Sequence, residues 1–230
     1  MRKIRTARER ARAELTQEIK DEARRQLADS GASGLSLRAI SRELGMVSSA
    51  LYRYFPSRDD LLTALIVDAY DALGERLEAA DAALSRESYR ERWQAFCHAA
   101  RDWARAHPNE YALVYGSPVP GYRAPEVTIG PASRVPAALL RIVLDAWDAG
   151  ALPEGGPPPT RTLAAQAAVI AELAAPGVPA APVARAGMAW AQVFGLISFE
   201  LFGHFANTLD PADDFYAYAV DGAAVALGLP

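Results

Sequence analysis

One short stretch holds residues well suited to contact nucleic acid: Tyr52 and Arg53, beside the small residues Ser49 and Ala50. A phenol hydroxyl and a guanidinium group can reach phosphate oxygens or base edges. On a helix that turns by about 100° per residue, Ser49 and Arg53 lie nearly opposite the apolar Leu51. Small side chains on that polar side would let the helix backbone approach the floor of a groove. The chemistry that this stretch predicts is recognition of DNA.

Two short helices joined by a tight turn must position these side chains. Ser36 is suited to cap the first helix, because its hydroxyl can accept a backbone N–H. Apolar residues then recur at helical spacing, at Leu37, Ile40 and Leu44. Gly45 supplies the turn, since glycine adopts positive φ without steric penalty. The second helix is expected at about 48–54 and ends before Pro56, so residues 36–55 form a predicted helix-turn-helix motif.

The motif and its surroundings resemble the DNA-binding domain of the tetracycline-repressor (TetR) family. That family shows Gly-apolar-Ser/Thr, then Leu-Gly-Val, then Leu-Tyr-x-His/Tyr-Phe, a basic residue and Leu-Leu. The chain has these in order over about residues 13–70, as Gly34-Leu35-Ser36, Leu44-Gly45-Met46, Leu51-Tyr52-Arg53-Tyr54-Phe55, Arg58 and Leu61-Leu62. The resemblance implies an all-α chain, with an N-terminal three-helix helix-turn-helix domain followed by a C-terminal helical ligand-binding and dimerisation domain.

The resemblance also implies roles for nine residues of the motif. Phosphate contacts are expected from Ser36, Arg38, Tyr52 and Arg58. The amino end of the first helix would assist the first two of these contacts. Base contacts are expected from Ser48, Ser49 and Ala50. Arg53 and Tyr54 lie where the family varies its contacts, so that base and phosphate both remain open.

The distribution of charge agrees with a DNA partner although the net charge of −4 does not. Residues 1–60 carry 13 Lys+Arg and 9 Asp+Glu, whereas the remaining residues carry 11 and 19. A basic end on an acidic body is expected when that end meets phosphates. Residues 1–12 are interpreted as a basic arm that follows the DNA backbone or enters the minor groove; a solvated tail is the alternative. The domain boundaries predicted beyond the arm are 13–73 and 85–230.

Two C-terminal helices, at about 183–207 and 211–227, are the expected dimer interface. The first is apolar around nearly its whole circumference, so it needs cover on all sides, and a second subunit is the natural cover. The resemblance implies a four-helix contact between two such pairs. Gly195 and Gly203 would allow close approach, unless they only relieve crowding within one chain. The run from Trp190 to Gly203-His204 also resembles the Trp…His-Gly…Leu-Glu…Gly-His signature of one TetR subgroup. It departs from that signature with Phe194 in place of the His and Phe199 in place of the Leu.

Aromatic residues of the C-terminal part are candidates for an effector pocket, although aromatic side chains at helical spacing are ordinarily core. The candidates are Trp93, Phe96, Trp103, Tyr111, Tyr115, Trp147, Trp190 and Phe194. Pockets of this kind are mostly apolar with few polar anchors, and the possible anchors are His98, His107, Asn109 and Glu172. The resemblance implies a small apolar or amphipathic effector that is not yet identified.

These expectations combine into a homodimeric repressor that a small molecule releases from an inverted-repeat operator in double-stranded DNA. An activator, a corepressor-dependent regulator and a non-specific DNA-binding protein are the alternatives. An enzyme is disfavoured, because the chain lacks Gly-x-Ser-x-Gly, P-loop, Gly-x-Gly-x-x-Gly and His-Glu-x-x-His motifs. No cofactor or metal site is expected.

The expected location is the cytoplasm. The single cysteine, Cys97, excludes an internal disulfide and a cysteine zinc cluster. No apolar run is expected to reach the roughly 18–20 residues of a membrane span, and the basic N-terminus has no apolar segment behind it that would make a secretory signal.

Overall fold

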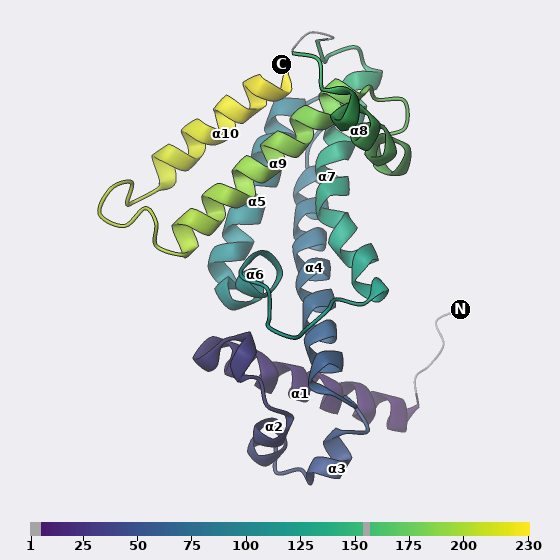
Figure 1. Ribbon diagram of the computed structural model, residues 1–230, viewed down its shortest axis with the longest axis vertical. Helices are drawn as coiled ribbons and strands as arrows, with labels where there is room; N and C mark the ends of the chain where they lie inside the picture. Colours follow the sequence, from purple (N-terminus) through teal and green to yellow (C-terminus); the bar gives the residue numbers. More distant parts are fainter. Residues whose placement is uncertain (1–5, 154–156) are drawn as a thin grey trace. The chain divides into compact units, whose positions relative to one another are not determined.

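The computed structural model describes residues 6–153 and 157–230, and these contain ten α-helices, two short 3₁₀ turns and no strand (Figure 1). The predicted all-α class is therefore confirmed. The elements up to the middle of the chain are α1 Ala7–Ser30, η1 Ala32–Gly34, α2 Leu37–Glu43, α3 Ser48–Leu51, α4 Arg58–Ala82, α5 Tyr89–Ala106 and α6 Pro108–Tyr115. They continue with η2 Glu126–Thr128, α7 Ile129–Asp148, α8 Arg161–Ala174, α9 Ala180–Leu201 and α10 Asp213–Leu227.

The described residues form two compact units, and the first is discontinuous in the chain. It joins the residues up to Ala69 with Asn109–Thr128, while Tyr70–Pro108 and Ile129–Pro230 form the second. The domain boundaries predicted from the sequence, 13–73 and 85–230, remain a prediction. They differ from the two compact units in the segment 109–128, which comprises α6 and the chain after it.

An apolar core holds the first unit together. Its most buried members come from α1, α2, α3 and the start of α4, and include Ile19, Leu27, Ile40, Leu51, Leu61 and Leu62. Leu113, Val119 and Tyr122 pack against this core from the 109–128 segment. The Tyr122 hydroxyl also lies 2.9 Å from Thr63 Oγ1. Residues far apart in sequence thus complete one core around the helix-turn-helix.

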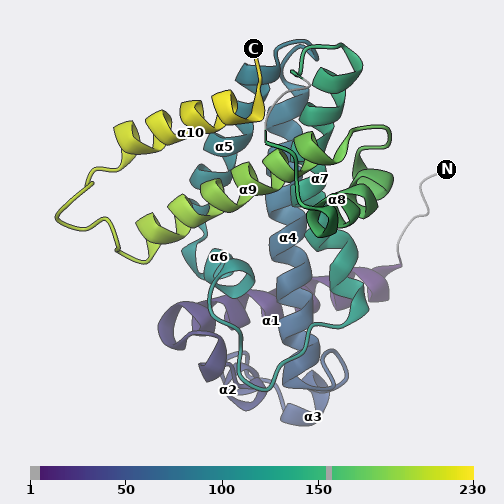
Figure 2. The same cartoon turned by 45° about the horizontal axis from the view of Figure 1, so that its top comes forward.

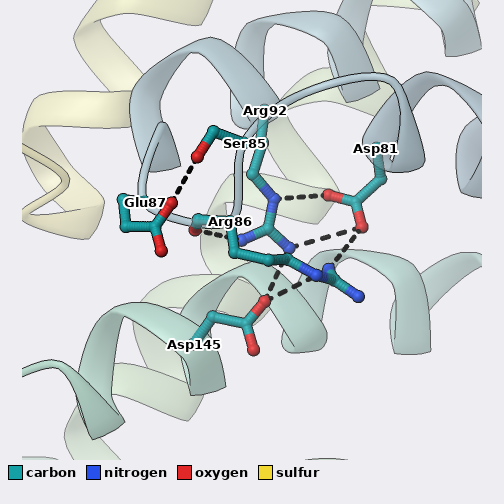
Figure 3. A network of polar contacts seen from close by, with 6 residues as sticks. All are labelled: Asp81, Ser85, Arg86, Glu87, Arg92 and Asp145. Atoms are coloured by element: carbon teal, nitrogen blue, oxygen red, sulfur yellow. Dashed lines mark hydrogen bonds and ion pairs between the residues drawn. The ribbon is translucent and has the colours of Figure 1, made fainter.

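A fully buried arginine joins three helices of the second unit (Figure 3). Arg92 of α5 donates from Nε to Asp81 at 2.7 Å and from Nη2 to Asp145 of α7 at 2.7 Å. Its Nη1 donates to the Arg86 carbonyl at 2.8 Å. Burial alone would lower the pKa of Arg92, but the hydrogen bonds to the two carboxylates raise it above its ordinary value. The charge is therefore retained inside the unit and fixes how α4, α5 and α7 meet.

A second arginine, Arg134 of α7, also binds the part of α4 that belongs to the second unit. It donates to Asp71 at 2.7 Å and to Glu78 at 2.8 Å and 3.0 Å. Its hydrogen bond and charge lower the pKa of the Glu78 carboxyl. Gly74 lies between the two acids, and a Cβ there would come within 2.9 Å of the Arg134 side chain. The glycine therefore permits the close approach of α7 to α4.

Helix α5 is also tied to the last two helices. Trp93 Nε1 donates to the Val220 carbonyl at 2.8 Å, and the Tyr216 hydroxyl donates to the Cys97 carbonyl at 2.7 Å. Arg101 donates to Glu200 of α9 at 2.7 Å and to Asp213 at 2.9 Å. Figure 2 shows α9 and α10 side by side against α5, as these bonds require.

One helix departs from the sequence expectation about membrane spans. Residues 126–148 are long and apolar enough to cross a membrane by length and composition alone. In the structure α7 packs against α5 and α9, its apolar residues Val135, Leu139 and Ile142 are fully buried, and Arg134 is ion-paired. These contacts show that α7 is a core helix of the second unit, which explains its apolar composition.

Several helix ends differ from the expected ones. Helix α1 begins at Ala7, within the range interpreted as the basic arm, because Thr6 and Glu9 form a capping box. Helix α3 ends at Leu51, three residues before the expected end, and the following residues form turns. Helix α9 ends at Leu201 rather than near residue 207, and Gly203 after it adopts φ +78°.

The Arg92 network gives a stability prediction. Arg92→Met removes the buried partner of Asp81, which is only 2 % exposed, so we expect a loss of about 3 kcal/mol. Arg86→Ala is the matched control, because Arg86 contacts the same two acids from an exposed position and should cost less than about 1 kcal/mol. Urea unfolding at one protein concentration measures both; equal losses would contradict the role given to Arg92.

Candidate DNA interface

The start of α2 is fixed by two side chains. The Ser36 hydroxyl accepts the Ala39 N–H at 3.3 Å, as a helix cap, and Gln26 of α1 accepts the Ser36 N–H at 3.1 Å. The predicted cap is therefore confirmed. Beside it, Arg38 is exposed on the first turn of α2.

The turn between α2 and α3 has the expected geometry. Gly45 adopts φ +63°, a conformation that costs a side-chain-bearing residue energy. The Met46 N–H then donates to the Ser41 carbonyl at 2.8 Å. The hydroxyls of Ser41 and Ser48 lie 3.1 Å apart and form a hydrogen bond that joins the two helices. This bond fixes the start of α3 against α2.

Helix α3 and the turn after it present a polar surface on a buried support. Leu51 is fully buried, while Tyr52 is 41 % exposed. Ser48, Ser49 and Arg53 are exposed as well, and Ala50 is half-buried. The side-chain hydroxyl of Tyr52 has no hydrogen-bond partner among the described residues. The structure thus brings the predicted contact residues of α3 to one solvent-facing region, with hydroxyl and guanidinium groups available to a ligand.

Arg58 and Tyr54 have partners within the protein. Arg58 Nη2 donates to the Ala32 carbonyl at 2.6 Å, so the guanidinium joins the start of α4 to η1. Tyr54 packs against the apolar core, and the Arg12 guanidinium lies 5.3 Å from its ring centre. Both residues were expected to contact DNA, and both also have a structural role.

Arg12 supports the candidate interface, and the sequence interpretation did not identify this role. It was expected in a basic arm, but it lies on α1, where Nη2 donates to the Arg53 carbonyl at 3.5 Å. It therefore braces the chain just after α3. No local pattern signals this contact, because the partners are 41 residues apart. Of the predicted arm, residues 1–5 lie outside the described residues, and Arg8 and Arg10 belong to α1.

The aromatic pocket candidates are distributed over both units. In the second unit Trp93 and Phe96 are fully buried and stacked, with ring centres 6.0 Å apart, and Trp190 and Phe194 are 5.9 Å apart. Trp103 is buried and Trp147 half-buried in the same unit. Tyr111 and Tyr115 belong to the first unit, with ring centres 5.1 Å apart. The eight residues therefore do not line one pocket within one unit.

Across residues 6–153 and 157–230, no group of three or more His, Cys, Asp or Glu side chains is placed to hold an ion.

Comparisons with known proteins agree with this geometry. Residues 19–65 match the family described as bacterial regulatory proteins, tetR family, and residues 93–223 match the tetracyclin repressor-like C-terminal domain. The HTH-type transcriptional regulator Rv1816 of Mycobacterium tuberculosis is 43% identical over 199 residues, which cover 85% of this chain and 84% of that protein.

Solved structures share the fold. A structure described as that of a regulatory protein, SCO4313, has a TM-score of 0.79 and 35% identity over 95% of this chain and 98% of that one. A protein of unknown function from a Rhodococcus species has a TM-score of 0.70 and 26% identity, covering 91% and 93% of the two chains. The TetR family transcriptional regulator PfmR from Thermus thermophilus shares the fold at 16% identity, with a TM-score of 0.57 over 92% and 97%.

Two substitutions distinguish a residue that only contacts DNA from a residue that also stabilises the fold. Tyr52→Phe removes an exposed hydroxyl without an internal partner, so we expect unchanged unfolding free energy and weaker binding to all DNA sequences alike. Arg58→Ala removes the bond to the Ala32 carbonyl and should also cost about 1–2 kcal/mol of stability. Urea unfolding and fluorescence anisotropy with labelled duplexes measure the two effects. A selective loss at one base position would contradict the phosphate roles.

Proposed function

The chain belongs to the TetR family of bacterial regulatory proteins and is a transcriptional regulator of that family, and from this premise we propose that it is a homodimeric repressor. A small molecule releases it from an inverted-repeat operator. The observation that carries the DNA-binding part is the exposed polar surface of α2 and α3, which rests on fully buried Ile40 and Leu51.

The proposed contacts follow from exposure and chemistry. Arg38, Tyr52 and Arg58 bind phosphates, and the amino end of α2, capped by Ser36, adds to that attraction. Ser48, Ser49 and Ala50 face the bases, where hydroxyls offer hydrogen bonds and the methyl group an apolar contact. The carbonyl of Arg53 is engaged by Arg12, but its own side chain is exposed and free to reach either bases or phosphates.

The proposed dimer uses α9 and α10. Helical glycines normally have a packing reason, because glycine costs about 1 kcal/mol relative to alanine inside a helix. Gly187, Gly195 and Gly222 have none within this chain, since an added Cβ at each would meet nothing within 4 Å. Crowding within the chain, the alternative explanation for Gly195, is thus disfavoured. For the three glycines on α9 and α10, we propose that the reason is the close approach of another helix.

Exposed apolar side chains on the same two helices support this interface. Met188 is 69 % exposed and Tyr218 78 % exposed, the others are Phe199 and Val225, and Phe202 is exposed directly after α9. A soluble chain normally covers such residues when they occur together. A second copy that packs α9 and α10 against its own pair would cover them. The two α3 helices would then meet successive major grooves, about 34–36 Å apart in the simplest case.

Regulation is proposed to pass through α4, which is continuous from Arg58 to Ala82. Its first part belongs to the DNA-binding unit, and Arg92 and Arg134 hold its second part. An effector bound among aromatic residues such as Trp103, Trp147 or Trp190 would favour one arrangement of the second unit. It can act only through different affinities for the two arrangements.

The alternatives keep the same DNA-binding chemistry. An activator or a corepressor-dependent regulator would differ only in which arrangement binds DNA. A non-specific DNA-binding protein would need neither the dimer nor the second unit. The cytoplasm is the proposed location, since the relatives are regulators of transcription.

Selection of bound sites from random duplex DNA tests the function. A symmetric dimer with two DNA-binding units should enrich a short inverted repeat whose half-sites lie about one helical turn apart. The control is the Tyr52→Phe variant, which should enrich the same repeat with lower recovery. Salt-sensitive binding without any enriched motif would favour the non-specific alternative.

The dimer predicts a strong effect of a bulky residue at an open glycine. Gly195→Leu should convert the dimer into a monomer, because the new side chain separates the two α9 helices, and operator binding should fall with it. Gly130→Leu is the matched control, since Gly130 is exposed, helical and also open around its Cβ position. Sedimentation equilibrium measures the state; an unchanged dimer would place the interface elsewhere.

A further inference from the structure

A groove of about 370 Å³ lies within the first unit. One wall is the end of α1 with η1, and the other is α6 with the chain that follows it. Figures 1 and 2 show these elements as neighbours, with the segment after α6 passing close to α1. The volume falls in the range of small-molecule sites, which begins at about 300 Å³.

The lining is apolar with a few polar groups. Leu27, Leu113 and Val119 contribute apolar surface together with two prolines, and the polar side chains are Asn109, Ser33 and Ser117. None of the lining residues is ionisable. Asn109 is half-buried, and its amide has no hydrogen-bond partner among the described residues. Since water reaches this amide, a ligand donor or acceptor would replace a water molecule there, with a modest net gain that orients the ligand.

We propose that this groove binds a small neutral amphipathic molecule, with its apolar body on Leu27, Leu113 and Val119 and a hydroxyl or carbonyl on Asn109. A charged molecule would lose its hydration without meeting a counter-charge, and the lining therefore excludes it. The site differs from the aromatic pocket proposed above, which lies in the second unit.

An occupant of the groove would touch the supports of the helix-turn-helix. The Ala32 carbonyl of η1 holds Arg58 at the start of α4, and Val119 packs on the apolar core. Tyr122, three residues after Val119, contacts Thr63 of α4. Filling the groove would therefore alter DNA affinity from within the DNA-binding unit. This consequence rests on the proposed function, whereas the binding itself does not.

Disulfide trapping on the full-length protein tests the site. Ser117→Cys places an exposed thiol on the groove wall. The native Cys97 is buried, and burial raises the pKa of its thiol, so it does not compete. The probes are disulfides that carry a 4-hydroxycyclohexyl group, a 4-carboxycyclohexyl group or hydroxyethyl alone as reference. Intact mass spectrometry under graded 2-mercaptoethanol measures the fraction of protein labelled by each.

We expect the neutral cyclohexanol probe to be retained on the Ser117→Cys protein about fivefold to tenfold more strongly than the hydroxyethyl reference. The carboxylate should show no such gain. Ala83→Cys is the control, because Ala83 is exposed in the turn after α4 and lies outside the groove. Adding Ala112→Leu to Ser117→Cys fills the groove and should abolish the gain while unfolding remains cooperative.

Equal retention of the three probes on the Ser117→Cys protein would overturn the site, as would an equal gain on the Ala83→Cys protein. Insensitivity to Ala112→Leu would overturn it too. DNA affinity of the trapped protein is measured separately. Trapping with unchanged DNA binding would overturn only the regulatory consequence, and loss of all DNA binding by the untrapped protein would count against the proposed function instead.

Discussion

The buried charge of Arg92 is the constraint on which the second unit depends. A guanidinium without solvent must find carboxylates and carbonyls in fixed directions, and here they come from α4, from the turn after it and from α7. Apolar packing alone would tolerate several ways of crossing these helices. The Arg134 contacts to α4 restrict them further. The part of α4 that would transmit a signal is thus positioned by charge and hydrogen bonds.

The first unit combines an apolar core with hydrogen bonds that fix its helix ends and turn, as at Ser36 and between Ser41 and Ser48. Ion pairs of Lys20 and Arg24 with Asp68 also join α1 to α4. The side chains of Ser49, Tyr52 and Arg53, in α3 and the turn after it, have no hydrogen-bond partner among the described residues. A rigid support beneath unpartnered polar groups is what selective contact with DNA requires, because little ordering remains to be done on binding.

The sequence predicted what depends on neighbouring residues. Ser36 as a cap, Gly45 in the turn and the all-α class need only local preferences, and the structure confirms all three. It could not reveal contacts between distant segments, such as Arg12 with Tyr54 or Arg58 with Ala32. The packing of segment 109–128 against the core of the first unit is another contact of this kind. The DNA, dimer and effector roles of particular residues stay predictions.

The discontinuity of the first unit has a consequence for synthesis on the ribosome. The helix-turn-helix emerges early, but the three side chains that complete its core, Leu113, Val119 and Tyr122, emerge only after the whole of α4 has been made. Until then part of the apolar core has no cover, although the chain can already form its helices. Domains commonly fold as they emerge. The core of the DNA-binding unit can therefore be completed only after α5 and α6 have been synthesised, although the helix-turn-helix is made much earlier.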